Sequence, residues 1–244
     1  MRKGSGAVAL ALLSAIVFVS AAYAQDGRSV VLRTNGQVLL KDAEGDFGML
    51  EINLHNSNWQ YGSQTEATAK CEDVVGGGKR CTGVIPVPQV VGAALSFLET
   101  ITPGEDGLKI VYEIQPAGPL VLNGLQVSLV LPTDRFGGEQ LVVKSAEAPE
   151  RRVALPRTLN PAQWQLGTIE GNAVQIGADE ATALTMTINK TYGLIIHDLR
   201  QWERDEFEIR IPIIQEDKGK MLSTTDRFSV EITLGPGEIA VTGP

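Results

Sequence analysis

Apolar and polar residues alternate with a period of two along most of the chain. The pattern is clearest in five segments, which span residues 108–115, 125–131, 184–189, 207–213 and 228–234. In one of them, Phe207, Ile209 and Ile211 alternate with Glu208 and Arg210. Successive side chains of a β-strand point to opposite faces of a sheet. The period therefore predicts strands with one face on a core and the other in water, as in antiparallel sheets.

Turn-forming sequences separate these segments. The clearest are the dipeptides Asn35-Gly36, Asn123-Gly124 and Lys218-Gly219. Glycine is favoured at such points because it adopts the backbone angles that tight reversals require. The segment with most helical character, residues 90–99, also fits a strand, and Gly92 disfavours a helix there. We predict an all-β fold: a large antiparallel β-sandwich of about a dozen strands.

The first 24 residues are typical of a secretory signal peptide. Arg2 and Lys3 precede an apolar run at 7–19, and Ala22-Tyr23-Ala24 forms a small-x-small cleavage site. So short an apolar run does not span a bilayer unaided. An uncleaved anchor is the alternative. We expect cleavage, and a protein that acts outside the cytoplasm, either periplasmic or secreted.

Cleavage would leave residues 25–244, which we expect to form a single β-sandwich domain. The whole chain has 21 Lys and Arg against 29 Asp and Glu. The signal peptide contains two of the cations, so 19 would remain and the net charge would be −10. So acidic a chain is repelled by phosphate backbones, which argues against a nucleic-acid partner. No later stretch approaches the length of a membrane span, so we expect no stable membrane insertion after cleavage.

Cys71 and Cys81 are the two cysteines of the chain. In an oxidising compartment their pairing is the default expectation. The glycines at 76–78 can reverse the chain between them and bring the sulfurs together. The disulfide should add about 2–3 kcal/mol in the chain-entropy model. We expect it to close a long loop at 62–83 and to fix a surface hairpin.

Two polar groups raise the question of metal binding or catalysis. Asp42, Glu44 and Asp46 alternate as in a calcium loop, but the pattern lacks the central glycine and the final glutamate, which favours an acidic turn. His197 is followed by Asp198, and such a pair could exchange protons near neutral pH. Neighbours on a strand point to opposite faces, however, so the two need not meet. We predict no metal site, no cofactor and no assigned catalytic residue.

Aromatic residues are sparse, at 5% of the chain, so their placement is informative. Trp59 and Tyr61 are alternate residues that could share a face, and Trp164 and Trp202 stand in polar surroundings. Exposed Trp and Tyr rings offer stacking surfaces for the C–H faces of sugars. The alternative is that these rings fill the sandwich core or cover its edges. Together with His197, these four residues are our predicted ligand-binding set.

Two segments resemble a known fold family. They are residues 122–138 (LNGLQVSLVLPTDRFGG) and 198–212 (DLRQWERDEFEIRIP). Both are similar to the β-supersandwich found at the N-terminus of some bacterial glycoside hydrolases, a fold that includes the galactose mutarotase-like proteins. The resemblance implies a carbohydrate context, often as an accessory to a separate catalytic domain. Mutarotase-like enzymes use paired histidines and a carboxylate, but His55 and His197 lie in no motif that matches theirs.

Three hypotheses follow. The first is a non-catalytic extracytoplasmic protein that binds carbohydrate or assists glycan-processing enzymes. The second is a structural or assembly protein of the cell envelope, with an envelope protein as its partner. The third is a small carbohydrate-active enzyme of the epimerase or lyase type, which would use His197, Asp198 and Asp205. The sequence favours the first and leans against an enzyme.

Overall fold

The computed structural model describes residues 27–105, 107–177, 183–237 and 239–244. The predicted signal peptide, residues 1–24, lies outside these residues. The strands are β1 (Ser29–Leu32), β2 (Val38–Asp42), β3 (Gly45–Asn56), β4 (Tyr61–Ser63), β5 (Thr68–Val74), β6 (Gly78–Pro86), β7 (Ala94–Gly104), β8 (Gly107–Pro116), β9 (Leu120–Pro132), β10 (Gln140–Lys144), β11 (Arg151–Ala154), β12 (Gln165–Ile176), β13 (Leu184–Asp198), β14 (Glu206–Leu222), β15 (Phe228–Gly235) and β16 (Ala240–Thr242). The helical segments are η1 (Gln64–Glu66), α1 (Thr133–Phe136), η2 (Pro161–Gln163) and η3 (Leu199–Trp202). None of these helices is long and apolar enough to cross a membrane.

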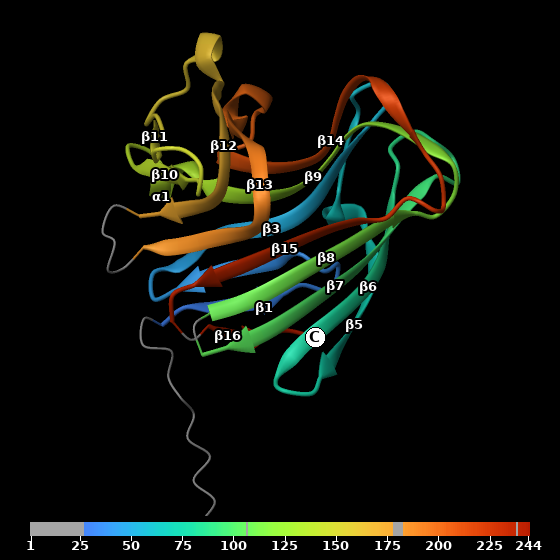
Figure 1. Ribbon diagram of the computed structural model, residues 1–244, viewed down its shortest axis with the longest axis horizontal. Coiled ribbons are helices and arrows are strands. Elements are labelled where there is room, and N and C mark those ends of the chain that lie inside the picture. Colours follow the sequence, from blue (N-terminus) through green and yellow to red (C-terminus); the bar gives the residue numbers. More distant parts are fainter. Residues whose placement is uncertain (1–26, 106, 178–182, 238) are drawn as a thin grey trace, which may run out of the picture.

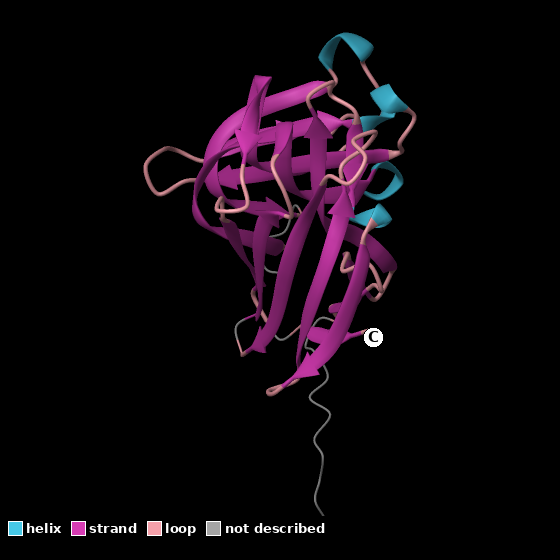
Figure 2. Ribbon diagram, turned by 90° about the vertical axis from the view of Figure 1, so that its right-hand side faces the viewer, coloured by secondary structure: helices cyan, strands magenta, loops and turns pink. Residues whose placement is uncertain are grey.

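Hydrogen bonds join the sixteen strands of the described residues into one strongly curved sheet (Figures 1 and 2). The main path runs β16-β1-β2-β3-β9-β14-β13-β15-β8-β7-β6-β5, and β4, β10, β11 and β12 attach at its sides. Strand β13 connects the two parts of the curved sheet, because its first half pairs with β15 and its second half pairs with β14. The curled sheet encloses its core as a sandwich does. The predicted all-β class is confirmed.

The hydrophobic core forms along the inner face of this sheet. In one row across four neighbouring strands, Leu50, Leu129, Ile209 and Ile196 lie opposite one another and are fully buried. Burying a side chain of this size stabilises a fold by about 1.5–3 kcal/mol. The register is fixed because a slip by one residue would turn this entire row away from the core.

The opposite face of the same strands differs from our expectation. Period-two alternation predicts that this face lies in water, yet Glu51, Asn53, Ser128 and Glu208 are each at most 1% exposed. Asn53 and Ser128 hydrogen-bond to Glu208, the hydroxyl of Tyr61 on β4 donates to Asn53, and Arg204, in the loop after η3, lies 3.9 Å from Glu51. The central strands β3, β9 and β14 are therefore buried on both faces, one apolar and the other polar.

The predicted disulfide is present and joins β5 to β6. Cys71 and Cys81 lie directly opposite each other, with their Cα atoms 4.1 Å apart. The surrounding chain is not the long loop that we expected at 62–83. It consists of β4, η1 and a regular hairpin whose turn contains Gly76 and Gly77, both at positive φ. The segment at 90–99 likewise enters strand β7 and forms no helix.

A buried carboxyl group in the core makes the fold sensitive to pH. Glu99 on β7 is fully buried opposite Tyr112, and Nε2 of Gln64 lies 3.4 Å from its Oε2. Burial raises the pKa of Glu99 from 4.5 to about 8. Between these values the native protein keeps the proton that the unfolded chain has lost. The free energy of unfolding therefore falls as the pH rises across this range.

We predict that Glu99→Gln removes this fall in the free energy of unfolding with rising pH. The variant should be more stable than the wild type by about 3 kcal/mol at pH 7, and the difference should nearly vanish close to pH 4.5. Urea denaturation at both pH values measures it. A difference that does not change with pH would contradict the assignment.

Candidate functional site

A cleft of about 880 Å³ lies over the polar face of β3, β13 and β14. The structure places all five predicted ligand-binding residues on its lining: Trp59, Tyr61, Trp164, His197 and Trp202. The remaining histidine of the chain also lines it. All three tryptophans and both histidines of the protein thus surround one cleft, although their positions in the sequence span more than half of the chain.

One wall of the cleft is formed by an aromatic group on β3 and β4. The ring of His55 lies 5.5 Å from that of Trp59 and 5.7 Å from that of Tyr61. The side chain of Asn56 shapes the turn between them, because its Oδ1 accepts hydrogen bonds from the backbone N–H groups of Asn58 and Gln60. Trp59 has a φ of 60°, a strained value for a bulky residue, and such strain clusters at ligand sites.

The second aromatic group belongs to η2, β13 and η3. Trp164 lies 4.9 Å from both His197 and Trp202, measured between ring centroids. The backbone holds this group in place, since the N–H of Asp198 donates to the carbonyl of Trp164 at 2.7 Å. Asp198 also caps η3 and pairs with Arg200 at 2.6 Å. Asp198 is completely buried and does not line the cleft, so it is not the partner of His197 in the cleft.

None of the three tryptophans is in the core. Trp59 is 42% and Trp202 50% exposed, and Trp164 is half-buried. These rings therefore do not fill the sandwich core. Their exposed faces form an apolar surface that a bound molecule can cover.

An ion pair forms the floor of the cleft. Glu208 lies opposite His197 on the neighbouring strand, and its Oε2 accepts a hydrogen bond from Nε of Arg210 at 2.6 Å. Its other oxygen accepts from the hydroxyl of Ser128 at 2.7 Å. Burial alone would raise the pKa of Glu208, but the interactions with His197, Arg210 and Ser128 lower it to about 2. Glu208 is therefore a carboxylate at neutral pH, neutralised by Arg210.

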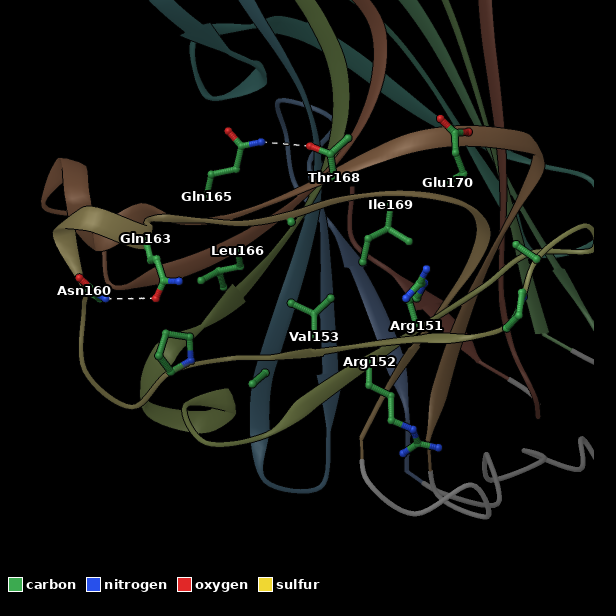
Figure 3. A pocket seen from close by; sticks show the side chains of 15 residues that line it. Arg151, Arg152, Val153, Asn160, Gln163, Gln165, Leu166, Thr168, Ile169 and Glu170 are labelled. Atoms are coloured by element: carbon green, nitrogen blue, oxygen red, sulfur yellow. Dashed lines mark hydrogen bonds between the residues drawn. The ribbon is translucent and has the colours of Figure 1, made fainter.

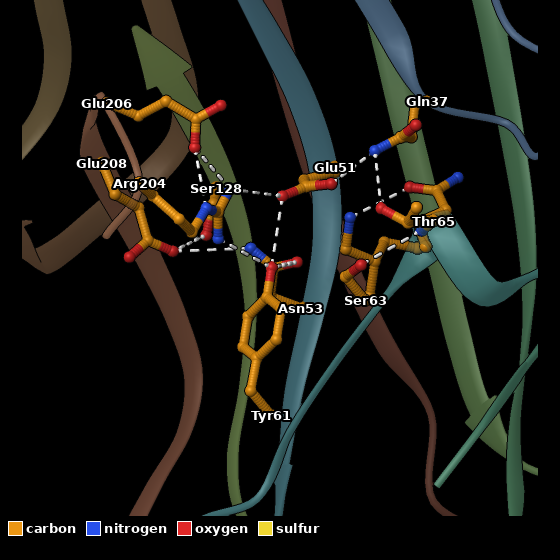
Figure 4. Close-up of polar contacts among 12 residues, drawn as sticks. Gln37, Glu51, Asn53, Tyr61, Ser63, Thr65, Ser128, Arg204, Glu206 and Glu208 are labelled. Atoms are coloured by element: carbon orange, nitrogen blue, oxygen red, sulfur yellow. Dashed lines mark hydrogen bonds and ion pairs between the residues drawn. The ribbon is translucent and has the colours of Figure 1, made fainter. Parts of the chain in front are cut away.

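A second polar network lies beside this ion pair (Figure 4). Arg204 bridges Glu206, at 2.6 Å, and the hydroxyl of Tyr61, at 3.2 Å. The Tyr61 ring is 42% exposed, whereas its hydroxyl reaches into the network and lies 3.4 Å from Glu51. Burial raises the pKa of both Tyr61 and Glu51. Glu51 is held from its other side by Gln37 at 2.5 Å. The acidic groups of this network are thus already bound to partners within the protein.

The two histidines are neutral hydrogen-bonding groups. Burial lowers the pKa of both, to about 4 for His55. Among the described residues neither buried Nδ1 has a hydrogen-bond partner; that of His197 lies 3.9 Å from Glu208, which is too long for a hydrogen bond. Neither Nε2 is buried or hydrogen-bonded within the described chain. Each imidazole therefore offers Nε2 to a molecule in the cleft.

Sequence reasoning missed the charged floor of the site. Glu208, Arg210 and Arg204 were not among the predicted residues, and His55 was noticed without being assigned a role. The period-two pattern places Glu208 and Arg210 on the non-core face of β14, but it does not say that other segments cover this face. The acidic residues at 42–46 lie at the turn between β2 and β3, where Asp42 pairs with Arg135.

The sequence matches no protein family profile and no curated protein. Solved structures do share its fold. A candidate aldose 1-epimerase from Escherichia coli superposes with a TM-score of 0.53 at 9% identity, over 85% of this chain and 98% of that one. A galactose mutarotase-related enzyme from Lactobacillus acidophilus gives 0.51 at 9% identity, over 88% and 96%. A protein from Synechocystis gives 0.51 at 9% identity, over 86% and 89%.

The chain has the galactose mutarotase-like fold. The resemblance drawn from residues 122–138 and 198–212 is thereby confirmed for the fold. At 9% identity the likeness extends to the course of the backbone and not to individual residues.

The Glu208–Arg210 pair allows a direct test of the site's electrostatics. We predict that Arg210→Met destabilises the protein by about 3 kcal/mol at pH 7, because it leaves a buried carboxylate without its counter-ion. The loss should shrink as the pH falls, since Glu208 in the variant is neutralised by taking up a proton at a higher pH than in the wild type.

The matched control is the double variant Glu208→Gln/Arg210→Met. It removes both charges, so it should regain most of the lost stability. Denaturant titrations at neutral and acidic pH make the measurement. Equal destabilisation by the single and double variants would show that the two residues do not act as a pair.

Proposed function

We propose that this protein binds a carbohydrate in the aromatic cleft. The observation that carries the proposal is that two aromatic groups, one containing Trp59 and the other Trp202, line a single cleft whose floor is polar. A sugar ring has apolar C–H faces and hydroxyl edges. Aromatic walls stack against the faces, while neutral imidazole nitrogens and the Arg204 guanidinium hydrogen-bond to the hydroxyls.

The charges of the cleft favour an uncharged sugar. Arg210 is neutralised by Glu208, and Arg204 by Glu206. A charged ligand would have to break one of these pairs and leave the other partner buried or half-buried, at a substantial cost in free energy. A neutral ligand leaves both pairs intact.

The same electrostatics favour binding over catalysis. A general acid or base works best when its pKa lies near the working pH. The pKa values of Glu208, about 2, and of His55, about 4, both lie well below neutrality. Neither group exchanges protons readily at pH 7, whereas His55 can still hydrogen-bond to a ligand through Nε2.

We predict that Trp202→Ala weakens carbohydrate binding at least about tenfold, because it removes a half-exposed stacking surface of the cleft. The probes are mono- to hexasaccharides of glucose, galactose and mannose, and the measurement is isothermal titration calorimetry. Stability should hardly change, since half of the ring is already exposed. The matched control is Met221→Ala, which truncates a 78% exposed apolar side chain that does not line the cleft.

Absence of binding by the wild type to every saccharide in the set would contradict the proposal. Equal affinities of wild type and Trp202→Ala for a saccharide that does bind would place the binding site elsewhere on the molecule.

The second candidate function is aldose 1-epimerase activity. It is favoured by one specific observation: His55, His197 and Glu208 all line one cleft in a fold shared with an aldose 1-epimerase candidate. The binding proposal predicts that the protein does not speed the mutarotation of fresh α-glucose or α-galactose in a polarimeter. Acceleration that is lost in His197→Ala would decide for the enzyme.

We further propose that the protein acts outside the cytoplasm, as an accessory to glycan-processing enzymes. The Cys71–Cys81 disulfide supports this location, because disulfides persist in oxidising compartments. A structural role in the cell envelope is the remaining alternative. A structural role would require a stable protein partner, and it would not explain why aromatic side chains line a cleft.

A further inference from the structure

A second hollow adjoins the cleft. This groove, of about 820 Å³, lies between the edge strand β11 and the first half of β12 (Figure 3). The groove exists because β10 pairs with only the second half of β12, at residues 173–176, and on its other side with β11. The first half of β12 is therefore paired on one side only, with β13. The segment 160–164, which contains η2, lies at one end of the groove.

Two side chains of β12 form the boundary between groove and cleft. Gln165 and Thr168 line both hollows, and Nε2 of Gln165 donates a hydrogen bond to the hydroxyl of Thr168 at 3.0 Å. The pairing of β12 with β13 shifts register between Gln165 and Gly167, and such a bulge changes the side on which the following side chains project. Both boundary residues are exposed polar groups, so they separate the two hollows without closing one from the other.

The groove is lined by aliphatic and polar side chains rather than by aromatic rings. Leu166 and Ile169 supply apolar surface, and Gln163 supplies an amide that bonds to Asn160 at 3.2 Å. The side chain of Arg151 is exposed and makes no hydrogen bond or ion pair among the described residues. These groups can contact sugar faces and donate to sugar hydroxyls without breaking an existing ion pair.

We propose that the ligand is an oligosaccharide chain that occupies the cleft, crosses Gln165 and Thr168, and continues into the groove. The inference rests on the proposed function and names the class of ligand. Each hollow alone has the volume of a typical ligand site. A monosaccharide would occupy one of them. An oligosaccharide chain can occupy both hollows at once. When one end is bound in the cleft, the other end reaches the groove at a high effective concentration, which raises the affinity.

The test compares affinity with chain length. Mono- to hexasaccharides of glucose, galactose and mannose are titrated into the wild type and into the double variant Arg151→Ala/Gln163→Ala, which changes only residues of the groove. The control variant is Arg80→Ala, which removes an exposed arginine of β6 that lines neither hollow.

We expect the hexasaccharide to bind the wild type at least about tenfold more tightly than the monosaccharide of the same sugar. The double variant should lose most of this advantage and keep its monosaccharide affinity, whereas Arg80→Ala should behave as the wild type. Equal affinities of mono- and hexasaccharide, or an advantage that survives in the double variant, would overturn this inference and leave the proposed function standing. Failure of every saccharide to bind the wild type would overturn both.

Discussion

The ion pair between Glu208 and Arg210 lets the central strands of this sheet be buried on both faces. An isolated charge in that position would be neutralised by a shift of its pKa or would destabilise the fold. With Arg210 on one side and Ser128 on the other, Glu208 remains a carboxylate while 1% exposed. The layer above it can therefore pack directly onto the sheet, and this layer carries the aromatic walls of the cleft.

The site combines a rigid floor with walls built from turns and single helical turns. The floor residues extend from long strands whose register the hydrophobic core fixes. Trp59 and Trp202 instead belong to a strained turn and to the end of η3. Because the charges of the floor are satisfied internally, what the cleft offers a ligand is aromatic surface and neutral hydrogen-bonding groups. That combination is the basis of the carbohydrate-binding proposal.

Local pattern was enough to predict the strands and the disulfide, and it singled out the tryptophans that the fold brings together in one cleft. Phe207, Ile209 and Ile211 define a strand by their period alone, and three tryptophans in so aromatic-poor a chain were natural candidates for a ligand site. The floor could not be predicted in the same way. Glu208 alternates with apolar residues as any solvent-facing charge would. It is buried because the fold places Asn53, Ser128 and His197, from three other strands, beside it.

The central claim is that one cleft holds all three tryptophans and binds carbohydrate there. It is tested most directly by NMR of protein labelled at the tryptophan indole nitrogens, titrated with the tightest-binding saccharide. The account predicts three indole N–H signals that all shift and that saturate together at a single dissociation constant. A saccharide that binds while all three signals stay in place would contradict it.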